Sequence, residues 1–181
     1  MGKTEQIEIP LSKKKMLLTF FGSIIFVVLG VLLLINPSMF ISTIFRNPTI
    51  IFIAGLFSVL FFGLCAIVIF RKFSDKKAGL IINREGIIDN SSGVSAGLVL
   101  WSDIKEIKIR SVVSQKFLVF IVENPHNYIE KFTNSLKRKA AEMNYKTYGS
   151  PITISANSLQ TNFNNLHNLL IEKMREYKIN H

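Results

Sequence analysis

The chain has 181 residues, a formal net charge of +10 and a hydrophobic fraction of 49%. The apolar residues are concentrated in two uncharged runs, whereas the rest of the chain is polar and rich in lysine. This segregation excludes a fully soluble globular protein, and the large apolar content excludes an intrinsically disordered one.

Two membrane-spanning helices are predicted, at 16–36 and 48–70, after an N-terminal segment at 1–15. Both runs are long enough, because crossing a bilayer core takes about 20 apolar residues. The first run is too long for a signal peptide and lacks an Ala-x-Ala ending, so we expect it to be retained. Asn47 is the expected cap of the second helix, with Pro48 in its first turn.

The charges that flank the two spans predict their orientation. Lysines at 13–15 precede the first span, and the connecting loop at 37–47 carries only Arg46. The basic residues of the juxtamembrane linker at 71–77 are Arg71, Lys72, Lys76 and Lys77. Basic residues favour the cytoplasmic side of a membrane. We therefore expect both termini in the cytoplasm and a short extracytoplasmic loop.

Glycines recur at the same spacing in both spans. Gly22 and Gly30 lie eight residues apart in the first span, as do Gly55 and Gly63 in the second. Eight residues are slightly more than two helical turns, so each pair lies on nearly one face and permits close helix approach. The pattern is compatible with packing inside the hairpin and with a homo-oligomer through these faces.

Residues 78–181 are expected to form one α+β domain in the cytoplasm, of a size that supports a single core. The expected strands lie at 78–83, 86–90, 98–101, from 104 onward, and at 151–155. The first two flank a polar turn that ends at Gly86 and predict a hairpin. Alternation of Phe117, Val119 and Ile121 predicts a half-buried antiparallel strand.

Two amphipathic helices are predicted in the same domain. The first covers 128–143, within a segment at about 126–143, and its apolar positions Ile129, Phe132, Leu136 and Met143 recur at three- and four-residue steps and their sums. The second closes the domain at 162–177, with Asn162 or Thr161 as its cap. Its apolar face comprises Phe163, Leu166, Leu169, Leu170 and Met174.

The strand pattern, with the sequences Gly-Ile-Ile-Asp at 86–89 and Leu-Trp-Ser-Asp-Ile at 100–104, resembles the bacterial pleckstrin-homology-like domain. With the Ile-Pro-Leu-Ser-Lys-Lys-Lys opening at 9–15, the two spans and Gly-Leu-Ile-Ile at 79–82, the whole chain resembles a family of small bacterial two-span inner-membrane proteins. The resemblance implies a bent antiparallel sheet or partly open barrel, closed by a C-terminal helix. The helix at 128–143 is then an insertion.

The inserted helix is the candidate binding surface. Its expected contact residues are Lys131, Phe132, Leu136, Lys137, Arg138 and Lys139. Because an anionic cytoplasmic leaflet attracts basic residues by about 1 kcal/mol each, membrane lipids are one expected partner and a protein is another. An ordinary solvated helix face, or an accessory subunit of a membrane enzyme or transport complex, remains an alternative.

Residues with catalytic potential are sparse in the sequence. Cys65 lies inside an apolar run, the three histidines lack metal-ligand spacing, and neither a nucleophile elbow nor a phosphate loop occurs. We expect no enzymatic activity, no metal and no cofactor. Nucleic acid is not an expected partner, because basic and aromatic residues do not interleave. Trp101, in the sequence Trp-Ser-Asp-Ile, is expected to pack in the core rather than to contact a ligand, and Asp103 to cap a turn.

Overall fold

The computed structural model describes residues 6–42, 45–73 and 77–180. The chain divides into two compact units. One unit contains the two apolar helices, from Lys13 onward, and the other combines the residues up to Ser12 with those from Lys77 onward. The second unit is therefore built from two separate stretches of the chain, one on each side of the helical hairpin.

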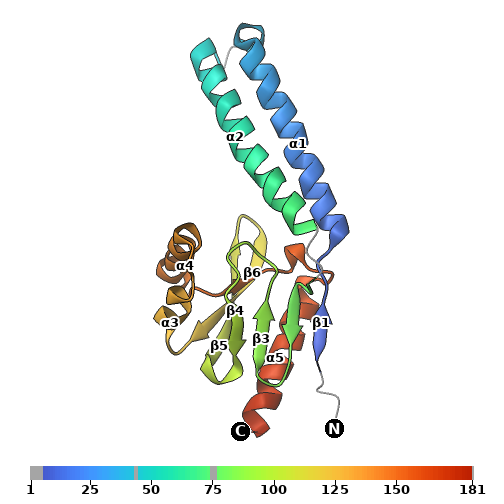
Figure 1. Ribbon diagram of the computed structural model, residues 1–181, viewed down its shortest axis with the longest axis vertical. Helices are drawn as coiled ribbons and strands as arrows, with labels where there is room; N and C mark the ends of the chain where they lie inside the picture. The colour runs from blue at the N-terminus through green and yellow to red at the C-terminus, as the bar shows by residue number, and fades with distance from the viewer. Residues whose placement is uncertain (1–5, 43–44, 74–76, 181) are drawn as a thin grey trace. The chain divides into compact units, whose positions relative to one another are not determined.

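The helical unit consists of α1 (Lys13–Ile35), the short 3-10 helix η1 (Pro37–Phe40) and α2 (Pro48–Phe73) (Figure 1). Both long helices have the length and apolar composition needed to cross a membrane. Only 11% and 17% of their most apolar stretches are buried, unlike the core helices of soluble proteins. The predicted cap of the second helix is confirmed, since Asn47 Oδ1 accepts a hydrogen bond from Thr49 N at 2.9 Å.

Helices α1 and α2 pack against one another at Gly30 and Gly55. A Cβ atom added to either glycine would lie 3.0 Å or less from the carbonyl oxygen of the other, so the two backbones meet there. Ser58 Oγ donates to the carbonyl oxygen of Phe26 across the same contact, at 2.9 Å. By contrast, a Cβ atom at Gly22 or Gly63 would meet nothing within 4 Å. Gly30 and Gly55 thus permit the close packing of α1 on α2, whereas Gly22 and Gly63 take no part in it.

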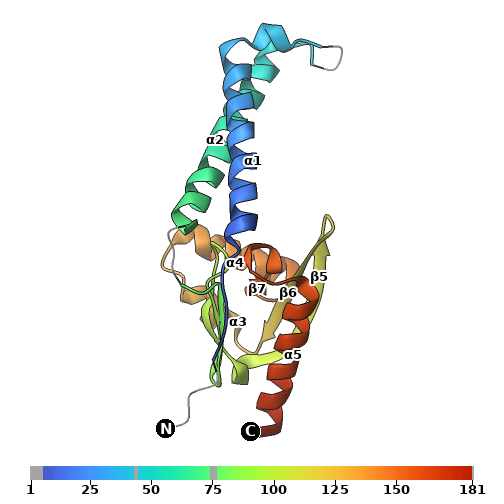
Figure 2. The same cartoon turned by 90° about the vertical axis from the view of Figure 1, so that its right-hand side faces the viewer.

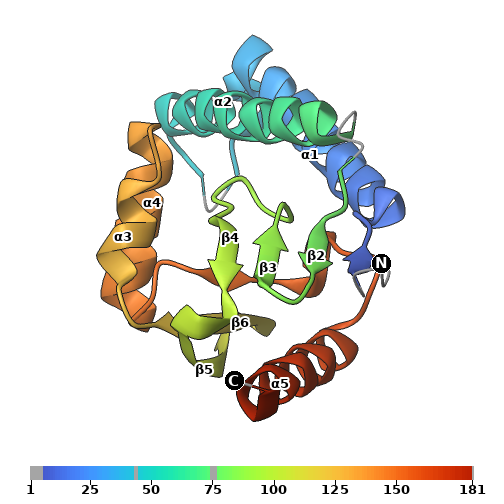
Figure 3. The ribbon, with the colours of Figure 1, turned by 60° about the horizontal axis from the view of Figure 1, so that its bottom comes forward.

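The second unit contains a four-stranded antiparallel sheet in the order β1-β2-β3-β4. Its strands are β1 (Ile7–Ile9), β2 (Leu80–Ile82), β3 (Gly86–Asp89) and β4 (Gly97–Leu100). The predicted β2–β3 hairpin is confirmed, and Asn83 Oδ1 holds its turn by accepting from Glu85 N and Gly86 N, each at 3.0 Å. Figure 3 shows β2, β3 and β4 side by side.

The N-terminal segment, for which the sequence predicts no strand, provides β1. Ile7 to Ile9 pair with Ile82 to Leu80, and Figure 1 shows β1 at the edge of the sheet. Beyond the strand, Leu11 forms a bridge with Leu159, and Ser12 N donates to the carbonyl oxygen of Ser158 at 2.8 Å. The chain thus enters the hairpin from one strand of this sheet and returns from the hairpin to the neighbouring strand.

A three-stranded antiparallel sheet in the order β5-β6-β7 completes the strands. They are β5 (Ile104–Val112), β6 (Gln115–Val122) and β7 (Thr153–Ile154), with the 3-10 helix η2 (Trp101–Asp103) before β5. Two helices, α3 (Pro125–Glu130) and α4 (Ser135–Tyr148), separate β6 from β7. The 3-10 helix η3 (Ala156–Ser158) follows, and then α5 (Phe163–Asn180), which is labelled in Figure 2.

Strand β6 is covered on both faces, which corrects the expectation of a half-buried strand. Leu118 and Phe120 are fully buried in the core, yet Val119 on the opposite face is fully buried as well. The ring of Phe117 packs against Tyr148 of α4, with centroids 5.0 Å apart. The inserted helices therefore cover the face of β6 that carries the alternating apolar residues Phe117, Val119 and Ile121.

One core joins both sheets and α5. The predicted closing helix is confirmed, because Leu166 and Leu170 are fully buried in this core and Asn162 Oδ1 caps the helix by accepting from Asn165 N at 2.9 Å. Trp101 is 2% exposed and donates its Nε1–H to the carbonyl oxygen of Asn83 at 2.9 Å, so its expected packing role is confirmed. The unit is an α+β domain with a C-terminal helix on two antiparallel sheets.

Candidate functional site

The predicted basic helix at 128–143 is wrong as a single element. Helix α3 ends at Glu130 and α4 begins at Ser135, with Asn134 as its N-cap. Asn134 Oδ1 accepts hydrogen bonds from Leu136 N at 3.0 Å and Lys137 N at 3.1 Å. An asparagine side chain that accepts from these N–H groups starts a new helix and competes with continuation of the preceding one. The helix is therefore interrupted before Asn134, although the apolar spacing continues through it.

The predicted apolar face is also divided. Ile129 on α3 is 3% exposed, whereas Leu136 and Met143 on α4 are 76% and 67% exposed. Phe132, in the segment that connects α3 to α4, is half-buried. The face of α4 that packs on the domain is instead centred on Ala141, which is fully buried. The spacing thus indicates an amphipathic segment but assigns its buried side incorrectly.

Aromatic side chains hold α3 and α4 in place. The ring of Tyr145 on α4 meets His126 on α3 with centroids 5.4 Å apart, and Tyr148 packs on Phe117 of β6. Gly149 ends α4 with φ of 83°, a left-handed conformation that glycine adopts without strain. The buried side of α4 is therefore its aromatic side, which leaves Leu136 and Met143 pointing away from the domain.

Tyr128 anchors α3 to the turn that precedes β5. Its hydroxyl donates to Asp103 Oδ2 at 2.7 Å and accepts from Leu100 N at 3.3 Å. Burial, followed by the hydrogen bond to Asp103, raises the pKa of Tyr128 from 10.0 to about 12. The sequence predicts that Asp103 caps a turn, but its Oδ2 accepts from this distant tyrosine and its Oδ1 accepts from the neighbouring Ser102 hydroxyl.

The cations of the candidate surface have different surroundings. Lys131 Nζ lies 4.2 Å from the centre of the Tyr128 ring, a cation–π contact, and Arg138 forms an ion pair with Glu142 at 3.3 Å. Within the described ranges, the exposed side chains of Lys137, Lys139 and Lys146 form no ion pair or hydrogen bond. The cations available for an outside partner are therefore these three lysines.

Four of the exposed residues share one side of α4. Leu136, Lys139, Met143 and Lys146 follow one another at steps of three, four and three residues, so they lie along a single stripe of the helix. We refer to these four residues as the outward face of α4. An apolar pair flanked by unpaired lysines suits a surface that is anionic on the outside and apolar beneath.

The other predicted site residues lie elsewhere. Arg71 and Lys72 are in the last turn of α2, and Lys77 follows in the α+β unit, while Lys76 lies outside the described residues. Cys65 is half-buried in α2. In the ranges 6–42, 45–73 and 77–180, no group of three or more His, Cys, Asp or Glu side chains is placed to hold a metal ion.

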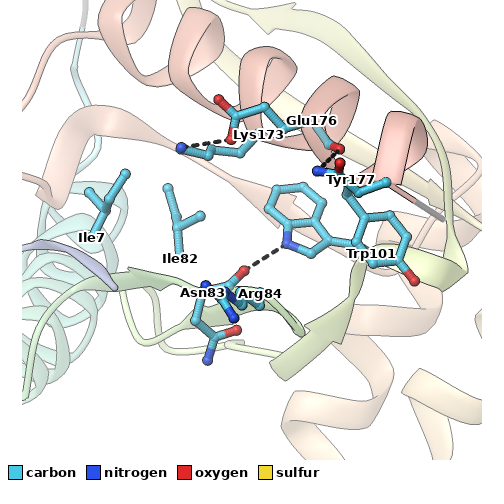
Figure 4. A pocket seen from close by; sticks show the side chains of 9 residues that line it. Ile7, Ile82, Asn83, Arg84, Trp101, Lys173, Glu176 and Tyr177 are labelled. Carbon is cyan, nitrogen blue, oxygen red and sulfur yellow. Dashed lines mark hydrogen bonds and ion pairs between the residues drawn. The ribbon is translucent and has the colours of Figure 1, made fainter. Parts of the chain in front are cut away.

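A pocket of about 390 Å³ lies between α5 and the β2–β3 turn, at residues that the sequence does not predict to form one site (Figure 4). Its lining comes from β1, β2, the β2–β3 turn, η2 and the last turns of α5. The lining residues are Ile7, Ile82, Asn83, Arg84, Trp101, Lys173, Glu176, Tyr177 and Asn180. Tertiary structure alone unites these residues, because they come from four distant parts of the chain.

Comparison with known proteins gives no relative from which a role could be transferred. No family model, no curated protein and no solved structure matches the chain.

Proposed function

We propose that this protein is a non-enzymatic, two-span protein of the bacterial inner membrane whose cytoplasmic, pleckstrin-homology-like domain binds the anionic membrane surface through the outward face of α4. The observation that carries the proposal is the exposure of Leu136 and Met143 beside two unpaired lysines on one helix stripe. A chain with two helices able to cross a membrane has a lipid surface within reach.

The strand pairing supports a topology with both ends of the hairpin on the same side. Strand β1 precedes α1 and pairs with β2, which follows α2, so one folded sheet holds both connections. A sheet of this kind forms only if both segments are in the same compartment. The lysines at 13–15 and the basic residues in and after the last turn of α2 then favour the cytoplasm for that compartment.

The strand order supports the pleckstrin-homology-like assignment. Four antiparallel strands, three further antiparallel strands and a closing helix on a shared core agree with a bent sheet capped by its last helix. The hairpin of α1 and α2 then interrupts the domain after its first strand, and α3 with α4 interrupts it before its last.

The chemistry of the outward face favours an anionic lipid surface. Lys139 and Lys146 each contribute on the order of 1 kcal/mol at such a surface, and partial burial of Leu136 and Met143 adds an apolar contribution. The one carboxylate near this side of α4, Glu142, is already paired with Arg138. No unpaired acidic group on α4 therefore opposes the lysines.

The test uses the full chain in lipid nanodiscs. In a Cys65→Ala background, a polarity-sensitive fluorophore is attached at Leu136→Cys, and in a matched control at Ile179→Cys of α5, which is 77% exposed. We expect a blue shift at position 136 when phosphatidylglycerol is added to phosphatidylcholine, and none at position 179. Raising the ionic strength should reverse the shift by screening.

Charge variants decide whether the lysines act as proposed. Lys139→Gln combined with Lys146→Gln should weaken the contact by about 2 kcal/mol. Lys108→Gln combined with Lys116→Gln removes the same charge from β5 and β6 and should leave the shift unchanged. An equal response in neutral and anionic lipid refutes the lipid-surface role. Retention of a stoichiometric second polypeptide in mild detergent would then favour the accessory-subunit alternative.

A further inference from the structure

The pocket between α5 and the β2–β3 turn has no part in the proposed lipid contact, and its lining is chemically mixed. Figure 4 shows Lys173, Glu176 and Tyr177 of α5 on one side, with Asn83 and Arg84 of the turn opposite. A volume of about 390 Å³ falls within the range of sites for small molecules, roughly 300 to 1,000 Å³.

Charge in the pocket is concentrated on one residue. Lys173 Nζ is 2.8 Å from Glu176 Oε2, so these two charges neutralise each other. The Arg84 guanidinium is exposed and forms no ion pair or hydrogen bond with any residue that the structure describes. A guanidinium presents a planar set of donors that matches a carboxylate. The lining therefore offers a net charge of +1 with Arg84 as the unsatisfied group.

The pocket also has an apolar part. Ile82 and Trp101 are 1% and 2% exposed and offer a ligand almost no surface, so the apolar surface that a ligand can reach belongs to Ile7 and Tyr177, which are partly buried beside the core. The indole N–H of Trp101 already donates to the carbonyl oxygen of Asn83, so this donor is not available to a ligand. A molecule in the pocket can therefore place a short apolar group against Ile7 and Tyr177 next to an anionic group on Arg84.

We propose that this pocket binds a small amphipathic carboxylate, with the carboxylate on Arg84 and the hydrocarbon part against Ile7 and Tyr177. A monoanion matches the net charge of the lining. A phosphate monoester carries a charge of about −1.5 to −2 at neutral pH, and its second charge would face the Glu176 carboxylate. The site is separate from the outward face of α4, so either proposal can fail without the other.

The test exploits Trp101, which is the only tryptophan in the chain and lines the pocket. The full chain in nanodiscs is titrated with hexanoate while its tryptophan fluorescence is recorded. We expect saturable binding, with half-saturation on the order of 1 mM for a ligand of this size. Across acetate, butyrate and hexanoate, affinity should rise by about threefold to fourfold for each methylene that is buried.

Neutral and doubly charged ligands test the carboxylate assignment. Hexanamide has the same hydrocarbon body without the charge and should bind at least about tenfold more weakly, because hydrogen bonds to charged groups are the stronger ones. Hexyl phosphate should bind no more tightly than hexanoate. Tighter binding of hexyl phosphate, or equal binding of hexanamide, would overturn the assignment.

Three variants test the residues. Arg84→Gln should weaken hexanoate binding by about tenfold or more, whereas Arg110→Gln, an exposed arginine on β5, should not change it. Glu176→Gln leaves Lys173 unneutralised and should tighten binding by about twofold to fivefold. An unchanged urea midpoint shows that each variant is folded. Wild-type affinity in Arg84→Gln, or no saturable fluorescence change in the wild type, refutes the proposal.

Discussion

Helices α4 and α5 show the same amphipathic pattern in sequence but attach to the domain in different ways. Helix α5 buries Leu166 and Leu170 completely, whereas α4 leaves Leu136 and Met143 at 76% and 67% exposure and attaches through tyrosines. The difference shows that an apolar stripe specifies a surface to be covered but not what covers it. In α5 the domain core covers the stripe, and in α4 the stripe stays exposed.

The largest expected effect is a difference in the free energy of unfolding between substitutions in the apolar stripes of α5 and α4. Leu170→Ala removes a fully buried side chain and should lower the free energy of unfolding by about 2 to 5 kcal/mol. Leu136→Ala, the same substitution on α4, should change it by less than about 0.5 kcal/mol. Urea unfolding of the full chain in mild detergent, followed by Trp101 fluorescence, measures both. Similar losses in the two variants would show that α4 also buries its stripe.

The hydrogen bond from Tyr128 to Asp103, which anchors α3, provides the second test, because α4 follows α3 in the chain. Tyr128→Phe keeps the ring beneath Lys131 but leaves Asp103 Oδ2 without the hydroxyl, so we expect a loss of about 1.5 to 3 kcal/mol. His126→Ala, which removes only a ring contact at the surface of α3, is the control and should cost less.

The same tyrosine gives a pH dependence of defined sign. Its pKa is about 12 in the folded chain against 10.0 as the ordinary value, so on raising the pH the unfolded chain releases this proton first. The stabilisation is therefore complete below pH 10 and is lost progressively between pH 10 and 12. Tyr128→Phe lacks this contribution, and the difference between the two proteins isolates it from lysine titration. A constant difference across that range would contradict the raised pKa.

The smallest effect should be equal in the two helices. Asn134 caps α4 and Asn162 caps α5 by the same side-chain bond to backbone N–H groups. Asn134→Ala and Asn162→Ala should each cost about 1 kcal/mol, because a cap is a local interaction that does not depend on what the helix packs against. Urea midpoints measure both. A much larger loss for Asn134 would mean that the α3–α4 break also positions α4.

Local signals in the sequence were sufficient for several elements. The uncharged apolar runs predict the two long helices, Asn83 and Gly86 predict the β2–β3 turn, and Asn162 with its following leucines predicts α5. In each case the information lies within a few neighbouring residues: hydrophobic period, cap or turn chemistry. These elements were therefore predictable with no knowledge of the fold.

The β1 strand, the break between α3 and α4, the buried side of α4 and the pocket depend on residues far apart in the chain. Ile7–Ile9 becomes a strand only because β2, more than seventy residues later, provides its hydrogen-bond partners. The side of α4 that carries Leu136 stays exposed because the opposite side packs on the domain. There, Tyr145 contacts His126 and Tyr148 contacts Phe117. The sequence by itself determined which segments are apolar, where helices are capped and where a turn forms. Tertiary structure decided which apolar surfaces meet, because burial is a property of pairs of surfaces and not of one segment.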